Sequence, residues 1–148
     1  NCNRYTIHIT GNKMRTINKI IIHCSATKEG KAFNVADITR WHKERGFNTI
    51  GYHWVVLLDG TISQGRPESV MGAHCTGHNT GSIGVCYIGG LDKNGNPKDT
   101  RTPEQKKALL ELLKRLKADY PNATIHGHRE FAAKACPCFD AKAEYANL

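Results

Sequence analysis

The sequence predicts a single domain of the α/β or α+β class, in which helices pack around one central sheet. Its 148 residues fit one domain, and no internal repeat or obvious linker divides them. A β-branched apolar run at residues 20–22 indicates a buried strand, and a long amphipathic pattern at residues 103–120 indicates a helix. Because predicted strands and helices are mixed along the chain, we expect both kinds of element to share one core.

The first expected elements are a buried strand at residues 19–23 and a short helix at residues 35–45. The strand contains three consecutive isoleucines with a polar residue at each end. In the helix, Asn34 is the expected N-cap and Gly46 the expected stop. The side chains that share one face of this helix are Ile38, Trp41 and His42.

A second and a third strand are expected in the middle of the chain. Residues 53–58 form the second strand, which the dipeptide Asp59-Gly60 turns into a short partner at residues 61–63. Residues 82–88 form the third strand. These patterns predict one hairpin and one further strand in the sheet.

The clearest helix begins after Thr102, which is the expected N-cap. Pro103 suits the first helical position, and Gln105 completes a capping box. The helix is expected to end at about residue 120, and a short strand follows at residues 124–126. Its apolar stripe consists of Leu109, Leu112, Leu113 and Leu116.

The chain carries a formal net charge of +8, which favours polyanionic partners such as nucleic acid or an anionic bacterial envelope. The basic residues are scattered, and no basic strand with interleaved aromatic residues is present. We therefore expect no specific nucleic-acid binding. No apolar run approaches the ~20 residues that a membrane-spanning helix needs.

The start of the chain is polar and lacks the apolar segment of a secretory signal. We expect residues 1–16 to be an N-terminal extension and residues 17–148 to form the main domain. Met14 is a candidate natural start, and the origin of the residues before it stays open.

Histidine and cysteine are the unusual residue types here. The six cysteines contain no C-x-x-C pair, so a zinc ribbon or a thioredoxin-type site is not expected. Reduced thiols are expected, with one disulfide, such as Cys75 with Cys86, left open. The cysteines are Cys2, Cys24, Cys75, Cys86, Cys136 and Cys138.

Three clusters offer metal ligands: His23 at a strand end, His126-Gly127-His128, and Cys136-Pro137-Cys138. Zinc binds imidazole nitrogen and thiolate sulfur tetrahedrally, and a catalytic site leaves one position for water. The spacing does not decide which residues of the second and third clusters would bind. A packed or exposed histidine without a metal is the alternative at each position.

Tyr52 directly precedes the second expected strand, and Lys134 lies two residues before Cys136. A phenol or an ammonium near a metal can stabilise the oxyanion of a tetrahedral intermediate. The alternatives are a half-buried strand residue for Tyr52 and a solvated charge for Lys134.

Nine ordered motifs lie between residues 17 and 140. They are Ile21-Ile22-His23-Cys24-Ser25-Ala26-Thr27, Trp41-His42-Lys43, Ile50-Gly51-Tyr52-His53-Trp54, Leu58-Asp59-Gly60-Thr61, Gly72-Ala73-His74, Asn79, Ser82-Ile83-Gly84-Val85-Cys86, Gly127-His128-Arg129-Glu130 and Ala133-Lys134-Ala135-Cys136-Pro137. With them the chain resembles the type-2 N-acetylmuramoyl-L-alanine amidases, which include amidase-type phage lysozymes and animal peptidoglycan recognition proteins. The last motif is most similar to the phage lysozymes, in which cysteine replaces the aspartate ligand of many relatives.

The resemblance implies an α/β fold with a mixed central sheet flanked by helices and one Zn²⁺ in a surface groove. It implies His23, His128 and Cys136 as the zinc ligands. Tyr52 would hold or help to deprotonate the attacking water, and Lys134 would stabilise the oxyanion.

The resemblance further implies hydrolysis of the amide bond between the lactyl group of N-acetylmuramic acid and L-alanine in peptidoglycan. His74 and Asn79 lie where relatives line the substrate groove, whereas His53 is expected to be structural. We expect a monomeric phage or prophage endolysin. It would be made in the bacterial cytoplasm and reach the wall after lysis or through a separate export aid.

Two alternatives compete with this hypothesis. The first is a module of the same fold that binds peptidoglycan without cleaving it, but such proteins typically lack a ligand, and here all are present. The second is a Cys-His hydrolase with Cys24, Cys75 or Cys136 as nucleophile. It predicts inhibition by thiol alkylation and indifference to a chelator.

Overall fold

The computed structural model describes residues 15–148. In chain order the elements are β1 (Lys19–Cys24), β2 (Thr27–Lys28), α2 (Val35–Glu44), β3 (Trp54–Val56), β4 (Ile62–Gln64), β5 (Ser82–Tyr87), β6 (Gly90–Leu91), α3 (Pro103–Asp119), β7 (Thr124–Gly127), the 3-10 turn η1 (His128–Glu130) and α4 (Ala141–Glu144). Residues 1–14, most of the expected extension, lie outside this description, so the boundary at residue 16 stays a prediction.

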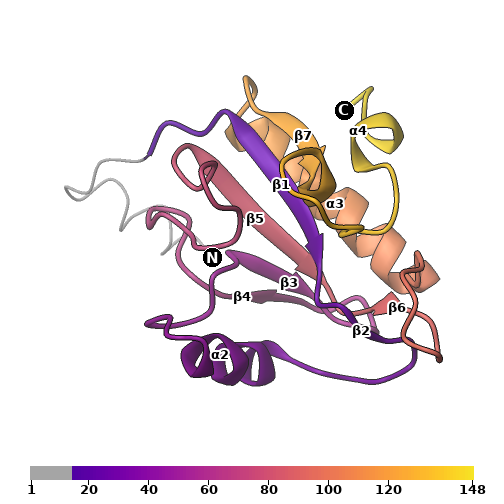
Figure 1. Cartoon of the computed structure of the whole chain (residues 1–148). Coiled ribbons are helices and arrows are strands. Elements are labelled where there is room, and N and C mark those ends of the chain that lie inside the picture. Colours follow the sequence, from indigo (N-terminus) through magenta and orange to yellow (C-terminus); the bar gives the residue numbers. More distant parts are fainter. Residues whose placement is uncertain (1–14) are drawn as a thin grey trace.

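Five strands form one mixed sheet in the order β4-β3-β5-β1-β7 (Figure 1). Strand β1 is parallel to both neighbours, and β3 is parallel to β5. Only β4, at one edge, runs antiparallel to its neighbour β3. The expected single α/β domain with a mixed central sheet is therefore confirmed.

The two faces of the sheet separate the core from the side that carries the candidate site. Successive side chains of a strand point to opposite faces. Ile20 and Ile22 of β1 belong to the main core cluster together with the leucine stripe of α3. Ile21 and His23 alternate with them and therefore face the other side, where Ile38 of α2 packs in a second cluster. Burial on both faces explains why the middle of this strand is an unbroken run of isoleucines.

Local capping explains where both long helices begin. The Asn34 side chain accepts from the backbone of Asp37 at the start of α2, and Thr102 accepts from Gln105 at the start of α3. Gln105 also donates from Nε2 to the backbone oxygens of Val56 and Ile88, at 3.2 and 2.9 Å. The buried side chain of Gln105 therefore caps the start of α3 and also joins this helix to the sheet. Both predicted helices are confirmed, each one residue shorter than expected.

The predicted strands are also present, with different lengths. The strand expected at residues 53–58 is limited to Trp54–Val56, and its hairpin partner is Ile62–Gln64. The parallel pair of β2 and β6 was not predicted. Two residues per strand are too few to give a periodic pattern, so no sequence signal marks this ladder.

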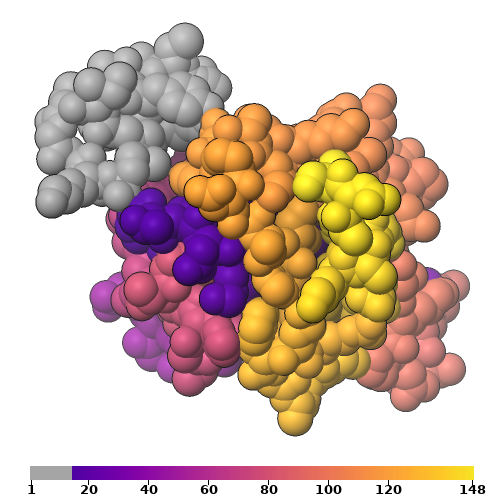
Figure 2. All heavy atoms as spheres, turned by 90° about the horizontal axis from the view of Figure 1, so that it is seen from above, coloured from indigo at the N-terminus to yellow at the C-terminus, as the bar shows by residue number. Residues whose placement is uncertain are grey.

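The C-terminal end of the chain covers the β7 edge of the sheet. Helix α4 packs beside β7, and Figure 2 shows the yellow C-terminal segment lying against the orange segment that precedes it.

Within residues 15–148, no helix combines the length and the apolar character required to cross a membrane.

Candidate functional site

The three predicted zinc ligands converge at one end of the sheet. One nitrogen or sulfur atom each from His23, His128 and Cys136 lies within 4.8 Å of the others. The Nδ1 atoms of His23 and His128 are 3.2 Å apart, although 105 residues separate them in sequence.

Sheet register explains how the two histidines meet. Strands β1 and β7 are parallel neighbours, and Ile22 is paired with Gly127. His23 follows Ile22 within β1, and His128 follows Gly127 as the first residue of η1, so the two histidines lie side by side. Because the ends of parallel strands share one sheet edge, this contact follows directly from topology.

The structure also distinguishes His128 from His126, which spacing alone did not. The His126 ring lies 2.7 Å from Thr124 Oγ1 and 2.8 Å from Glu130 Oε1, so both its nitrogens are engaged away from the ligand group. Cys138 is likewise occupied elsewhere, since its thiol donates to the backbone oxygen of Gly90 at 3.2 Å.

Cys136 has a backbone partner that suits a metal-bound thiolate. The amide of Cys24 donates to Cys136 Sγ at 3.1 Å. The hydrogen bond with Cys136, followed by burial, raises the pKa of the Cys24 thiol far above its ordinary value. Cys24 therefore stays a neutral thiol beside the candidate ligand.

The cysteines of residues 15–148 are all free, so the Cys75–Cys86 disulfide that the sequence left open is not formed. Burial raises the pKa of Cys75, as contact with Cys136 and burial do for Cys24. A nucleophilic cysteine needs a lowered pKa. Neither thiol has one, which disfavours them as nucleophiles of a Cys-His hydrolase.

Burial keeps the histidines of the site neutral. His23 is 1% exposed, and burial together with His74 and His128 holds its pKa well below the ordinary value. Burial, followed by the nearby Lys134, lowers the pKa of His128. Neutral imidazole has the lone pair that a metal requires, so these side chains suit Zn²⁺ in a site with two nitrogens and one sulfur.

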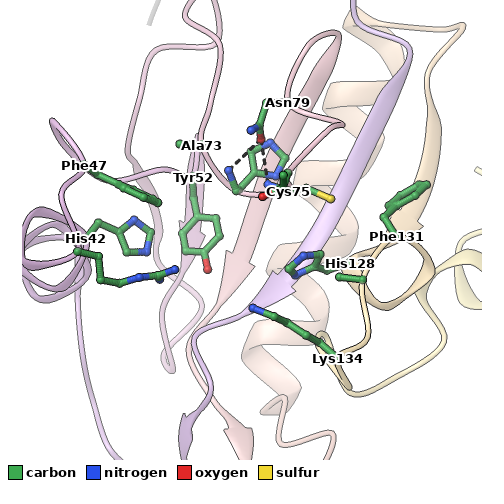
Figure 3. Close-up of a pocket in the computed structure, with 13 residues that line it drawn as sticks. His42, Phe47, Tyr52, Ala73, Cys75, Asn79, His128, Phe131 and Lys134 are labelled. Atoms are coloured by element: carbon green, nitrogen blue, oxygen red, sulfur yellow. Dashed lines mark hydrogen bonds between the residues drawn. The ribbon is translucent and has the colours of Figure 1, made fainter.

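Tyr52 and Lys134 face the same space as His128 from different elements (Figure 3). Tyr52 precedes β3, and its ring centroid lies 5.1 Å from that of His23. Burial raises the pKa of the Tyr52 phenol well above its ordinary value, so it remains protonated. Lys134 is exposed and reaches into this space from the segment after η1.

A groove opens over these residues. Its lining includes the predicted Tyr52, His74, Asn79, His128 and Lys134, whereas His23 and Cys136 do not line it. The other lining residues are His42, Arg45, Phe47, Ala73, Cys75, Thr76, Phe131 and Ala132.

Several groove residues were missed by the sequence reasoning. His42 was predicted only as part of a helix face, yet its Nδ1 accepts from the Gly51 amide at 2.8 Å and its ring lies 5.2 Å from that of Tyr52. Phe131 stacks on His78 with ring centroids 4.2 Å apart. The motif around Trp41 could have drawn attention to His42, but no spacing signal marks Phe131.

The two predicted substrate contacts are tied into the protein. Asn79 Oδ1 accepts from the amides of His74 and Cys75, both at 2.9 Å (Figure 3). The His74 ring lies 2.8 Å from His23 and 3.2 Å from Ser82. Burial lowers the pKa of His74 to about 3. Contact of either residue with substrate stays a prediction.

His53 has structural contacts, as the sequence reasoning expected. It is fully buried, its Nδ1 accepts from the Gly84 amide at 3.0 Å, and its Nε2 donates to the Val70 carbonyl at 2.7 Å. Both nitrogens are therefore used within the fold.

A family model described as N-acetylmuramoyl-L-alanine amidase matches residues 11–139. The endolysin of Escherichia phage T7 is 46% identical over 123 residues, which cover 83% of this chain and 82% of the relative. The endolysin of Klebsiella phage KP32 is 44% identical over 130 residues, which cover 88% and 86%.

Solved structures agree with these matches. The N-acetylmuramoyl-L-alanine amidase LysC from Clostridium intestinale is 29% identical, with a TM-score of 0.74 over 88% of this chain and 82% of its own. Drosophila PGRP-LB is 25% identical, with a TM-score of 0.75 over 93% and 84%.

Proposed function

From the premise that this chain belongs to the N-acetylmuramoyl-L-alanine amidase family, we propose that it is a zinc-dependent peptidoglycan hydrolase. Its substrate would be the amide bond between the lactyl group of N-acetylmuramic acid and L-alanine. The observation that carries the proposal is the convergence of His23, His128 and Cys136 within 4.8 Å beside an open groove.

Those three residues would hold the metal. Zinc supplies Lewis-acid polarisation of the scissile carbonyl and lowers the pKa of water to about 7. The Tyr52 hydroxyl, kept protonated by burial, would hold the attacking water. The Lys134 ammonium would donate to the oxygen that becomes negative as the carbonyl carbon turns tetrahedral.

The reaction balances with water as the only co-reactant. The water oxygen bonds to the lactyl carbonyl carbon, and the bond from that carbon to the L-alanine nitrogen breaks. One water proton ends on the departing amine, which leaves a lactyl carboxylic acid on the sugar and a free amino terminus on the peptide.

A role as a phage-type endolysin is supported by the two phage relatives, which are called endolysins and match most of this chain. The net charge of +8 would favour an anionic bacterial envelope. We place the site of action at the cell wall, reached after synthesis in the bacterial cytoplasm. Peptidoglycan would be the partner, and a monomer remains the expectation.

The test is digestion of purified peptidoglycan followed by mass analysis of the products. Stem peptides with a free L-alanine amino terminus, and their loss when a chelator is added, are the expected result. Cleavage between sugars, or binding without cleavage, would overturn the proposal. His128→Gln should abolish product formation, whereas the matched control His126→Gln, two residues away, should preserve it.

A further inference from the structure

We propose that His74 positions the metal centre by fixing the ring orientation and the tautomer of His23, an inference that rests on the proposed zinc-dependent function. His74 would act through His23 and is therefore a positioning residue. Its role would be exerted before any substrate arrives.

The two nitrogens of His23 face different partners. Nδ1 lies 3.2 Å from His128 Nδ1, on the side of the ligand group, whereas Nε2 lies 2.8 Å from His74 Nδ1. A neutral imidazole carries one proton, so Nδ1 has a free lone pair only when the proton is on Nε2. That proton can then be donated to His74, provided that His74 Nδ1 is an acceptor.

A hydrogen-bonded chain that ends at a carbonyl satisfies this condition. His74 Nε2 lies 3.2 Å from Ser82 Oγ, and the Ser82 hydroxyl donates to the backbone oxygen of Asn79 at 3.3 Å. A carbonyl cannot donate, so the serine proton points to it and Ser82 Oγ accepts from His74 Nε2–H. His74 Nδ1 then has a free lone pair that accepts from His23 Nε2–H. These hydrogen bonds favour the His23 tautomer whose Nδ1 can bind a metal.

The surroundings of His74 hold its ring in place. A Cβ atom at Gly84, in the interior of β5, would lie 2.6 Å from the ring, and one at Gly72 would lie 2.7 Å from it. Neither glycine has a left-handed backbone that would require glycine. Both positions lack a side chain because the His74 ring packs directly against the backbone there. Asn79 Oδ1 fixes the backbone of His74 at 2.9 Å.

Buried partners of this kind commonly tune metal sites. A histidine ligand usually donates its other N–H to a fixed acceptor, and loss of that acceptor typically costs about 10- to 100-fold in metal affinity. Here the acceptor is an imidazole rather than a carboxylate, and its own orientation is set by Ser82.

The experiment measures Zn²⁺ affinity of the full chain by competition with a chromogenic chelator, without substrate. His74→Leu should weaken binding about 10- to 100-fold. His74→Asn places an amide oxygen near the position of Nδ1 and should recover most of the loss. The visible spectrum of the Co²⁺-substituted protein should change in the leucine variant and return in the asparagine variant.

Ser82→Ala provides an independent test if His74→Leu does not fold. It should weaken Zn²⁺ binding about three- to tenfold, the value of one neutral hydrogen bond. Unchanged Zn²⁺ affinity in a folded His74→Leu variant would overturn the proposal, even if hydrolysis declined. If His74→Leu does not fold, unchanged Zn²⁺ affinity in Ser82→Ala would overturn it. Tight Zn²⁺ binding by the wild type without peptidoglycan cleavage would overturn the proposed function only.

Discussion

The backbone amide of Cys24 donates to the sulfur of Cys136 at 3.1 Å, a contact between residues 112 positions apart in the sequence. Cys24 is the last residue of β1 and directly follows the candidate ligand His23. One strand end thus presents a ligand and supports a second one. Donors to a ligand sulfur orient it and reduce the cost of its negative charge.

Cys136→Ala should therefore lose the metal. We expect about one zinc per chain in the wild type and little in this variant, measured by elemental analysis of protein made in zinc-supplemented medium. Cys138→Ala is the matched control, because its thiol bonds to Gly90 and lies outside the ligand group, so it should keep its zinc. Zinc retained by Cys136→Ala would contradict the assignment.

Lys134→Ala should lower kcat by about 10²–10³-fold, as expected for loss of one oxyanion donor. Zinc content should be unchanged, since Lys134 is not in the ligand group. The measurement is the steady-state rate of peptidoglycan hydrolysis at saturating substrate. Lys107→Ala, an exposed lysine on α3, is the control that removes one charge without touching the groove. Equal rates for the two variants would remove Lys134 from the mechanism.

Gly84→Ala should disturb the metal centre without changing any polar group. The added methyl would lie 2.6 Å from the His74 ring, so either the ring or the strand must move. We expect a lower melting temperature and weaker Zn²⁺ binding, because the overlap displaces the partner of His23. Thermal unfolding and chelator competition check the two effects separately. A variant with wild-type values in both would show that the ring has room to shift.

Glu144 should contribute an acid-sensitive part of the stability. Its Oε1 lies 2.9 Å from a nitrogen of the buried Arg101, and this hydrogen bond lowers the carboxyl pKa below its ordinary value of 4.5. A lowered pKa in the folded state means that the stabilisation is complete above the unfolded value and is lost as the pH falls through the folded one. Melting temperatures should therefore decline below about pH 4.5.

The Glu144→Gln variant isolates that contribution. Its melting temperature should decline less than that of the wild type between pH 5 and pH 3, because no carboxylate remains there to be protonated. Glu111→Gln, at an exposed position on α3, should follow the wild type. If the Glu144→Gln and wild-type curves run parallel over this range, the contact with Arg101 adds no pH-dependent stability.

Features of the fold that depend on neighbouring residues were predictable. The start of α3 was anticipated from Thr102, Pro103 and Gln105 because a capping box is a contact between residues three apart. The isoleucine run marked β1 because burial on both faces requires an apolar strand. The ladder of β2 and β6 was not predictable, since its pairing partners are about 60 residues apart and only two residues long.

The candidate site shows the same division. Sequence reasoning identified the residue types that suit zinc, and the family resemblance selected His23, His128 and Cys136 from among them. It did not anticipate that His74 would contact His23 or that His42 would line the groove. Both features depend on how segments far apart in the sequence pack against the sheet, and no local pattern encodes that packing.

By itself, then, the sequence determined which candidate ligand groups are present, namely imidazoles at strand ends and a cysteine thiol. It also determined, through caps and apolar stripes, where helices and strands form. Only the tertiary structure decided which imidazoles share a space. The register of β1 with β7 brings His23 beside His128 and leaves His126 with Glu130. Ligand geometry is a long-range property, because it depends on strand pairing that is stabilised by the whole core rather than by adjacent residues.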